Sequence, residues 1–394
     1  MQRLLGQVSD MGGMQFNCTC GKHHAFNIEH IHIGSGILSD IVEIAAPFKD
    51  KTVFLYGDQN TYAAAGERVE KLLCDAGFSV QLFTFQTGDG ALIPDERALG
   101  RLLMEIASDI GLIIGVGSGS LNDLGKYLSA KTGIPYAIVC SAPSMDGYLS
   151  DSSAFIIDGR KVTLPSTLAY AVLGDMQILK AAPDKLLQAG FGDLVGKLTA
   201  LADWLLARDV AGEAYCQACA DLVQRALIIT KKCAGGIKTH DEAAIADLFE
   251  GLLLTGVAMC LMGITRPASG AEHMLSHFWE MDFLNRGEFP ELHGIKVGVA
   301  TPVVAQLFSM LSDILPQNVA KAAPTREEVE ALLTQAGAPV YPLDGDVDRQ
   351  LFYQSILGAN TVRKRYSILQ FAIDNGRIEQ CAKALTEYFY GKGE

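Results

Sequence analysis

The sequence lacks a hydrophobic run long enough to cross a membrane. Its longest nearly uncharged apolar stretch, residues 251–264, lies between Glu250 and Arg266. A membrane-spanning helix needs roughly 20 predominantly apolar residues, so this stretch suits a buried helix instead. The first residues, MQRLLGQVSDMGG, contain no apolar segment of the kind that a signal peptide carries. We therefore expect a cytoplasmic protein without a membrane span.

Positive charge is also scarce. The chain has 32 Lys and Arg against 45 Asp and Glu, which gives a formal net charge of −13 at pH 7. No run of Lys and Arg stands out that could override this balance locally, and a negative protein repels a polyanion. The composition therefore argues against nucleic acid as a partner.

The chain has no internal repeat, no low-complexity tract and no flexible Gly/Ser linker. Its 394 residues are too many for one ordinary domain and suit two, each with its own core. The nine cysteines, an odd number, are scattered from Cys18 to Cys381. In a chain of this size that usage indicates free thiols in a reducing compartment.

One cysteine cluster is an exception to this scatter. Cys18, Cys20, His23 and His24 offer four soft or borderline metal ligands within one short segment, which could hold zinc. A structural zinc site usually joins two ligand pairs from separate turns, and no second pair is evident in the sequence. The alternative is a polar turn near the N-terminus with a small buried thiol.

The first half of the chain alternates short β-branched or aromatic runs with longer amphipathic runs, a pattern typical of βαβ units. We expect strands at 52–56, 80–85, 111–116 and 136–140, with helices at 61–76, 98–108 and 120–132. Asp158-Gly159 predicts a hairpin between 154–157 and 161–164. From about Pro183 the apolar spacing becomes helical. These patterns predict a Rossmann-like α/β domain with a mostly parallel sheet over 1–182, and an all-α domain over 183–394.

A glycine-rich segment, Gly115 to Asp123, joins an apolar strand directly to a helix. Glycines let the backbone approach a pyrophosphate, the hydroxyls of Ser118 and Ser120 can donate to it, and a helix N-terminus attracts anions. The segment is neither a P-loop nor a G-x-G-x-x-G fingerprint at the first strand. It therefore indicates nucleotide binding in a variant arrangement, although such turns also serve packing.

Asp58 follows the first clear strand. A carboxylate at that place can accept hydrogen bonds from a ribose, and it would favour NAD over NADP by repelling a 2′-phosphate. Asp58 can equally be the N-cap of the helix that begins near Thr61. The sequence leaves both roles open.

The helical half contains candidate metal ligands. Residues 190–197, GFGDLVGK, are expected to open a helix, and His273 and His277 are four apart, so they project from one helix face. One carboxylate, from Asp193, and two imidazoles make a three-ligand divalent site that leaves positions open for substrate. Taken singly, each histidine is more often an ordinary core or surface group.

These residues resemble the glycerol-1-phosphate dehydrogenases, in the superfamily of dehydroquinate synthases, glycerol dehydrogenases and iron-containing alcohol dehydrogenases. The matching motifs lie in the same order over about residues 50–305: GSGSLND, SAPSMDGYLS, GFGDLVGK, RPASGAEHMLSH and LHGIKVG. The segment CTCGKHH resembles the start of the bacterial branch. The spacer 278–292 is longer than in archaeal members. The resemblance implies a dehydroquinate synthase-like fold, and we expect a homo-oligomer.

The resemblance implies residue roles position by position. It makes His277 and Asp146 substrate-contacting groups. The implied metal ligands are Asp193, His273 and His293. The implied cofactor-binding residues are Gly117, Ser118, Gly119, Ser120, Leu121, Ser141, Ser144 and Ser150.

The implied reaction is the metal-assisted reduction of dihydroxyacetone phosphate to sn-glycerol 1-phosphate by NADH or NADPH, a step of phospholipid metabolism. A divalent metal, zinc or nickel, would act as the Lewis acid, and His277 would relay the proton. A polyol dehydrogenase is an alternative. A dehydroquinate-synthase-like lyase is another alternative. Its metal site would have Glu at the position of Asp193, which counts against it. Iron-containing alcohol dehydrogenases would have a third histidine where Lys197 stands, which disfavours iron.

Lys197 lies one helical turn after Asp193 and so projects from the same helix face. We predict that it contacts the substrate phosphate, because a negative enzyme that binds two anions must place cations locally. Two alternatives stay open. Lys197 can form an ion pair with Asp193, and Arg266 can bind the phosphate instead.

Overall fold

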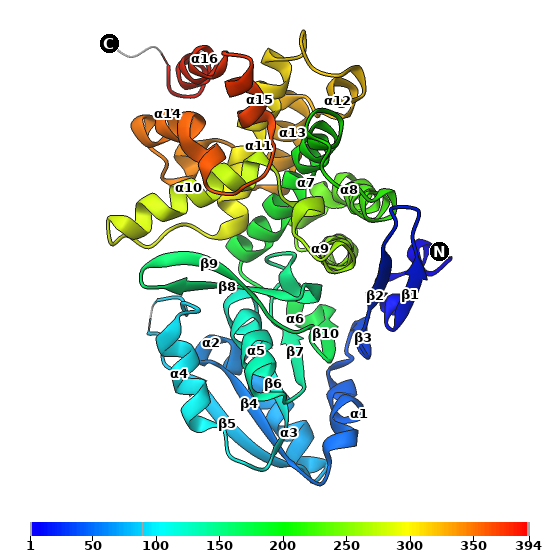
Figure 1. Ribbon diagram of the computed structural model, residues 1–394. Helices are drawn as coiled ribbons and strands as arrows, with labels where there is room; N and C mark the ends of the chain where they lie inside the picture. Colours follow the sequence, from blue (N-terminus) through cyan, green and yellow to red (C-terminus); the bar gives the residue numbers. More distant parts are fainter. Residues whose placement is uncertain (1, 89, 392–394) are drawn as a thin grey trace. The chain divides into compact units, whose positions relative to one another are not determined.

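The structure of the protein, a computed structural model, describes residues 2–88 and 90–391 (Figure 1). The chain forms two compact units. Unit 1 holds the residues up to Asn17 and His23–Pro183, and unit 2 holds Cys18–Lys22 and the chain from Asp184 onward.

Unit 1 is built on one six-stranded sheet in which every neighbouring pair of strands is parallel. The strand order is β3-β10-β7-β6-β4-β5. The strands are β3 (His30–Gly34), β4 (Thr52–Asp58), β5 (Ser79–Phe85), β6 (Ile110–Gly117), β7 (Tyr136–Cys140) and β10 (Ala171–Asp175). The central strands are apolar and buried on both faces, as parallel strands between helical layers must be. The Rossmann-like parallel sheet predicted from the sequence is thus confirmed.

Helices cover both faces of this sheet. Leu55 and Ala137 face a core shared with α1 and α3, whereas Tyr56 and Tyr136 point to the opposite face. There the Tyr56 hydroxyl donates to the Leu121 carbonyl of α5 over 2.6 Å. The helices of unit 1 are α1 (Ile41–Ala45), α2 (Gln59–Thr61), α3 (Glu67–Asp75), α4 (Glu96–Glu105), α5 (Gly119–Thr132) and α6 (Met176–Leu179), with short 3-10 turns η1 (Gln2–Leu5), η2 (Val8–Met11), η3 (Leu38–Asp40), η4 (Ala46–Phe48) and η6 (Gly147–Leu149).

The predicted helix 61–76 is divided in the structure. It begins with α2, continues as a π-helical turn η5 (Tyr62–Gly66) and ends with α3. At the end of the π turn, Gly66 packs on the Tyr62 ring, where a Cβ would come within 2.7 Å. The sequence contains no periodic signal for this change of pitch.

Two antiparallel hairpins accompany the main sheet. β1 (Met14–Asn17) pairs with β2 (His23–Phe26), and β8 (Ser152–Ile157) pairs with β9 (Arg160–Pro165). The second hairpin is the one predicted from Asp158-Gly159. Both residues have positive φ, 50° and 73°, as a tight two-residue turn requires.

Unit 2 contains helices and no strand among its described residues. They are α7 (Asp184–Ala211), α8 (Gln217–Ile237), α9 (Glu242–Met262), α10 (Ala271–Asn285), α11 (His293–Met310), α12 (Gln317–Ala322), α13 (Arg326–Ala336), α14 (Arg349–Gly358), α15 (Ile368–Asp374) and α16 (Ile378–Tyr390), with turns η7 (Arg266–Ala268), η8 (Pro342–Gly345) and η9 (Ala359–Thr361). The all-α prediction for this half is confirmed.

The apolar stretch 251–264 belongs largely to α9. Asp241 caps the start of this helix by accepting from the Ala244 N–H over 2.9 Å, and Gly263 ends it with φ 71°. By length and composition α9 could span a membrane, but 78% of its most apolar window is buried inside the protein. That burial identifies α9 as a core helix.

Candidate active site

Two helices of unit 2 meet where their backbones touch. On α7, a Cβ at Gly192 would lie 2.3 Å from the Gly294 carbonyl oxygen of α11. A Cβ at Gly294 would lie 1.8 Å from the Ala189 carbonyl oxygen. Only glycine permits this approach, and it brings together the two neighbours of these glycines, Asp193 and His293. The expectation that residues 190–197 open a helix was wrong. They lie inside α7, because this helix already begins at Asp184.

Asp193, His273 and His293 form one cluster. One carboxylate oxygen and one nitrogen from each histidine lie within 4.8 Å of one another. The His273 Nε2 atom lies 3.6 Å from Asp193 Oδ1, and the rings of His273 and His293 are 5.2 Å apart between centroids. Asp193 is fully buried, and His273 is 6% exposed. One carboxylate and two imidazoles are a donor set that suits zinc and nickel.

Glu272 holds the orientation of His273. Its Oε1 atom lies 2.8 Å from His273 Nδ1 and accepts from the Gly270 N–H over 2.6 Å, while Oε2 accepts from the Thr199 hydroxyl over 2.7 Å. Burial raises the pKa of Glu272, but the bonds from His273 and the other donors outweigh it and hold the pKa below its usual value. A fixed carboxylate at Nδ1 directs Nε2 toward Asp193, as ligand-orienting carboxylates do at metal sites. The sequence analysis missed Glu272, although its position directly before His273 was a signal.

Lys197 forms an ion pair with Asp193. The Lys197 Nζ atom lies 2.6 Å from Asp193 Oδ1, and both side chains are fully buried. Burial raises the pKa of Asp193, but Lys197 and the neighbouring histidines hold it far below its usual range. Of the two roles weighed for Lys197, the ion pair is thus present in the structure, and phosphate binding stays a prediction.

His277 lies beside the same cluster, with ring centroids 5.6 Å from His293 and 6.4 Å from His273. Its Nδ1 atom is 3.3 Å from Nη2 of Arg363. Arg363 belongs to the basic run 363–365 between η9 and α15, which the sequence analysis overlooked. Three consecutive basic residues in an acidic chain were the available signal.

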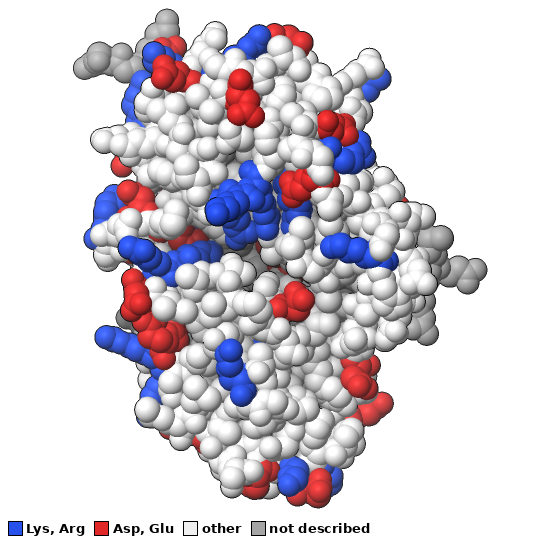
Figure 2. All heavy atoms as spheres, in the orientation of Figure 1, with Lys and Arg blue, Asp and Glu red and all other residues white. Residues whose placement is uncertain are grey.

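Two arginines crowd this side of the cluster. Arg363 Nη1 donates to the Thr265 hydroxyl over 3.0 Å, and Arg365 Nη2 donates to the same oxygen over 2.6 Å. Burial lowers the pKa of Arg365 to about 9, and the charges of Arg363 and Arg266 add to this effect. Basic side chains gather on the face of unit 2 seen in Figure 2. Crowded guanidinium groups favour an anion between or beside them.

Arg266, the predicted competitor for the phosphate, is fully buried and engaged within unit 2. Its Nε atom donates to Glu213 over 3.0 Å, and Nη2 donates to the carbonyls of Asp203 and Tyr366 over 2.9 and 2.8 Å. These contacts join three segments of the chain. They give Arg266 a structural role.

In unit 1, the predicted cofactor loop connects β6 to the N-terminus of α5. Ser118 is the N-cap residue, but its side chain makes no capping bond. Its hydroxyl contacts Ser144 and accepts from Tyr148 over 3.2 Å. A Cβ at Gly119 would meet only Met145, at an ordinary 3.4 Å, whereas a Cβ at Gly117 would collide with Leu121 at 2.2 Å. A Cβ at Gly119 would therefore make only an ordinary contact with a side chain, whereas Gly117 serves packing.

The segment that carries Ser141, Ser144 and Ser150 is fixed by α5. The fully buried Lys126 donates to the Gly147 carbonyl over 2.9 Å and to the Ser150 hydroxyl over 3.1 Å. The Ser141 N–H donates to the Gly117 carbonyl over 2.9 Å, which ties this segment to the cofactor loop. Ser120 is half-buried on the first turn of α5, and the half-buried Asp146 precedes the short turn η6.

Asp58 has the capping role that the sequence left open. Its Oδ1 atom accepts from the N–H groups of Asn60 and Thr61 over 2.9 and 2.8 Å. In return, the Asp58 N–H donates to the Thr61 hydroxyl over 3.0 Å. Asp58 ends β4, which places it at the carboxyl end of a parallel strand, where nucleotide folds bind their ligands.

Sequence comparison identifies relatives that match along almost the whole chain. Residues 31–183 match the family model described as iron-containing alcohol dehydrogenase. Glycerol-1-phosphate dehydrogenase [NAD(P)+] of Geobacillus stearothermophilus is 32% identical over 386 residues, which cover 90% of this chain and 95% of that protein. The enzyme of the same name from Thermococcus kodakarensis is 31% identical over 340 residues, which cover 86% of this chain and 90% of that protein.

The chain belongs to the glycerol-1-phosphate dehydrogenase family. A further member, from Halalkalibacterium halodurans, is 35% identical over 78% of this chain and 77% of its own length. Because the Geobacillus match covers 90% of this chain, it extends into the C-terminal ninety residues, where the motifs were weakest.

Solved structures show the fold at lower identity. Glycerol dehydrogenase from Schizosaccharomyces pombe superimposes with a TM-score of 0.67 at 16% identity, covering 93% of this chain and 92% of that one. Maleylacetate reductase from Rhizobium sp. strain MTP-10005 gives a TM-score of 0.70 at 16% identity, covering 94% and 99%. This member of the glycerol-1-phosphate dehydrogenase family therefore shares the fold of glycerol dehydrogenases and maleylacetate reductases.

Proposed function

We propose that this protein interconverts dihydroxyacetone phosphate and sn-glycerol 1-phosphate with NAD(P)H, the activity that its relatives' name describes. One observation carries the proposal beyond the family name. The Asp193, His273 and His293 cluster, the proton-carrying group His277 and the Arg363–Arg365 pair all lie together in unit 2. That combination suits a small ketone with a phosphate attached.

Asp193, His273 and His293 would hold one divalent metal, with Glu272 orienting His273. Zinc and nickel both accept these ligands. When bound, the metal supplies Lewis acidity toward the substrate ketone, and NAD(P)H supplies the hydride. Because these three protein ligands would leave a coordination position open, an oxygen of the substrate could join them.

His277 would deliver the proton to the product oxygen. A guanidinium can only donate, so the contact with Arg363 makes Nδ1 of His277 the acceptor. The neutral ring then carries its proton on Nε2, the atom from which it would be delivered. Asp146 would orient a substrate hydroxyl.

Arg363 and Arg365 would bind the substrate phosphate. Guanidinium groups pair well with phosphate oxygens, and this pair lies beside His277 with its shared anchor at Thr265. Lys197 remains a second candidate, although its ion pair with Asp193 directs its charge to the carboxylate.

The α/β half, residues 1–182, would bind the nucleotide, and the helical half, 183–394, would bind metal and substrate. The α5 N-terminus would bind the pyrophosphate, and the residues around it are Gly117, Ser118, Gly119, Ser120, Leu121, Ser141, Ser144 and Ser150. Asp58 would contact the ribose. We further propose a cytoplasmic homo-oligomer with a role in phospholipid metabolism.

Activity measurements with defined metal content test this proposal. Purified protein is depleted of metal, reloaded with zinc or nickel, and assayed for NADH and NADPH oxidation with dihydroxyacetone phosphate, dihydroxyacetone and glycerol. We expect turnover of the phosphorylated ketone only with metal, and its loss together with bound metal in His273→Ala. Full activity after confirmed metal removal, or a preference for the unphosphorylated ketone, would contradict the proposal.

A further inference from the structure

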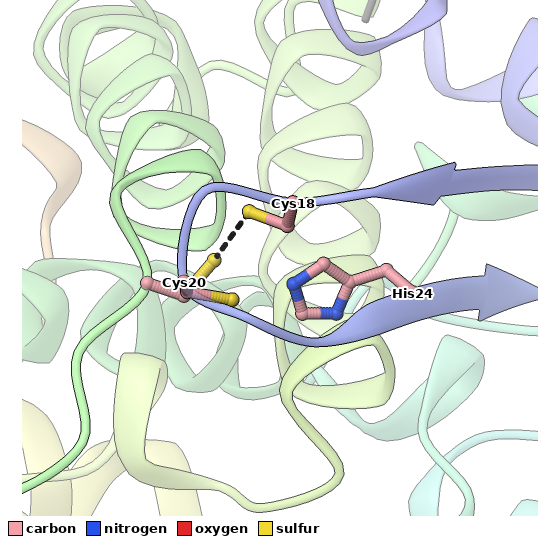
Figure 3. Close-up of side chains that lie close together, drawn as sticks. Cys18, Cys20 and His24 are labelled. Atoms are coloured by element: carbon pink, nitrogen blue, oxygen red, sulfur yellow. Dashed lines mark hydrogen bonds between the residues drawn. The ribbon is translucent and has the colours of Figure 1, made fainter.

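A second group of metal-binding residue types lies at the turn between β1 and β2. The Cys18 N–H donates to the Lys22 carbonyl over 2.9 Å, and the Gly21 N–H donates to the Cys18 carbonyl over 3.0 Å. Gly21 has φ 84°, a conformation that favours glycine. This tight turn brings the side chains of Cys18, Cys20 and His24 close together (Figure 3).

Strand alternation separates the two neighbouring histidines. His24 is 1% exposed, and its ring packs against Phe16 on the paired strand at 5.2 Å between centroids. His23 points the other way, is exposed, and contacts the Asn17 side chain over 2.9 Å. Successive residues of a strand face opposite sides, so only His24 turns toward the thiols.

A fourth residue of a metal-binding type comes from the start of α8. Cys216 is the N-cap residue of that helix and is fully buried. Its sulfur lies 3.6 Å from the Cys18 sulfur, although 198 positions separate the two residues. One atom each from Cys18, Cys20, His24 and Cys216 lies within 4.8 Å of the others.

We propose that Cys18, Cys20, His24 and Cys216 bind a structural zinc ion. Three thiolates and one imidazole are a complete tetrahedral ligand set for zinc, with no position left for a substrate. With zinc–sulfur bonds of about 2.3 Å, the edge of a regular tetrahedron is about 3.8 Å, close to the 3.6 Å between Cys18 and Cys216. A disulfide would require about 2.05 Å.

The surroundings also favour this site. Cys216 stands at the N-terminus of α8, where the helix dipole favours a negative charge. An N–H donor at a helix start stabilises the negative charge of a coordinating thiolate. Lys22 anchors the turn by donating to the Met262 carbonyl over 3.3 Å. The site shares no residue with the Asp193 cluster, so it does not rest on the proposed reaction.

Cobalt substitution distinguishes the two metal sites in the intact protein. Cobalt(II) bound to thiolates gives an intense near-ultraviolet charge-transfer band, which an Asp/His/His site cannot produce. We expect this band in the full-length protein purified with a reductant and loaded with cobalt, and its loss when zinc is added. We also expect His273→Ala to keep the band, and metal analysis to find about one zinc ion per chain at the thiolate site.

Variants separate ligation from packing. Cys20→Ser and His24→Ala should lose the band and the zinc, whereas His24→Cys should restore both, because a fourth thiolate also completes the tetrahedron. Cys74→Ser, at an exposed cysteine of α3, is the matched control and should change neither. A wild-type protein without the band, a band retained in Cys20→Ser, or a Cys18–Cys216 disulfide found by mass spectrometry without reductant would each overturn the proposal.

Discussion

Arg363 Nη2 lies 3.3 Å from Nδ1 of His277, and this contact sets which nitrogen of the imidazole carries the proton. Arginine has no acceptor, so Nδ1 must accept and Nε2 must keep its hydrogen. A residue absent from the recognised motifs thus connects the proposed phosphate contact to the proposed proton donor. Substrate binding and proton delivery would then depend on the same guanidinium.

We predict that Arg363→Met weakens the binding of dihydroxyacetone phosphate far more than the binding of dihydroxyacetone. A charge-assisted hydrogen bond contributes about 1.5–3 kcal/mol, which corresponds to a roughly tenfold to hundredfold rise in KM. Steady-state kinetics with both ketones measure the effect. Lys364→Met is the matched control, because its side chain is exposed on the same segment. An equal change for the two ketones would rule out a phosphate-specific role for Arg363.

Lys197→Met should destabilise the metal-free protein. Removing one partner of a fully buried ion pair costs about 3–5 kcal/mol, because the other charge remains buried without compensation. Metal binding at Asp193 would restore much of this stability. Urea unfolding with and without zinc measures both states. If the stability is unchanged and only the KM for dihydroxyacetone phosphate rises, Lys197 contacts the phosphate as first predicted.

Gly294→Ala should force α7 and α11 apart, because the added Cβ lies 1.8 Å from a backbone carbonyl that cannot rotate away. We expect lower thermal stability together with loss of metal affinity, measured by unfolding and metal titration. Gly235→Ala on α8 is the control. Nothing lies within 4 Å of its added Cβ, so this change should stabilise by about 0.5–1 kcal/mol. Normal metal binding by Gly294→Ala would disprove the role assigned to the glycine crossing.

Gly119→Val should abolish NADH binding and leave the fold intact. Its Cβ meets only Met145, at an ordinary distance, so the added methyl groups would occupy the space expected for the pyrophosphate. Fluorescence titration with NADH measures the loss. Gly100→Val on α4 provides a comparison, because its added Cβ has no neighbour within 4 Å. Unchanged NADH affinity in Gly119→Val would show that the cofactor loop is assigned wrongly.

Asp203 should make stability depend on pH. Burial raises its pKa to about 7, with Arg266 opposing the shift and Glu272 adding to it. Between about pH 4 and pH 7 the folded chain holds a proton that the unfolded chain releases, so this contribution to stability falls as pH rises through the window. Urea unfolding measures the free energy of unfolding of wild type and of Asp203→Asn. The wild-type value minus the variant value should decrease as pH rises across this range and stay constant above it. A difference independent of pH would refute the assignment.

The sequence pattern predicted those strands and turns whose formation depends on residues close together in the chain. The strands β4, β6 and β7 were recognisable because they are apolar and buried on both faces, and Asp158-Gly159 specified its own turn. The strand β10 was missed because Ala171–Asp175 ends in Gly-Asp and lacks a long β-branched run. The hairpin β1–β2 was missed because its strands are only four residues long and half of their residues are polar.

The candidate site was predictable only as far as its motifs extend. Asp193, His273 and His293 could be named in advance, and their proximity depends on glycines whose tight contact no spacing reveals. Arg363 comes 86 positions after His277 and adjoins it only through the tertiary fold. Cys216 was likewise invisible as a partner of Cys18, because a ligand pair divided between distant segments leaves no periodic signal.

The contact between Cys18 and Cys216 has a consequence for biosynthesis. The N-terminal turn leaves the ribosome first but cannot meet its partner until 198 further residues have been added. At about 5–20 residues per second, that delay is roughly 10–40 seconds. During this interval two thiols and an imidazole are exposed on the nascent chain, open to oxidation or to a passing metal. A reducing environment would therefore protect these thiols before the protein has folded.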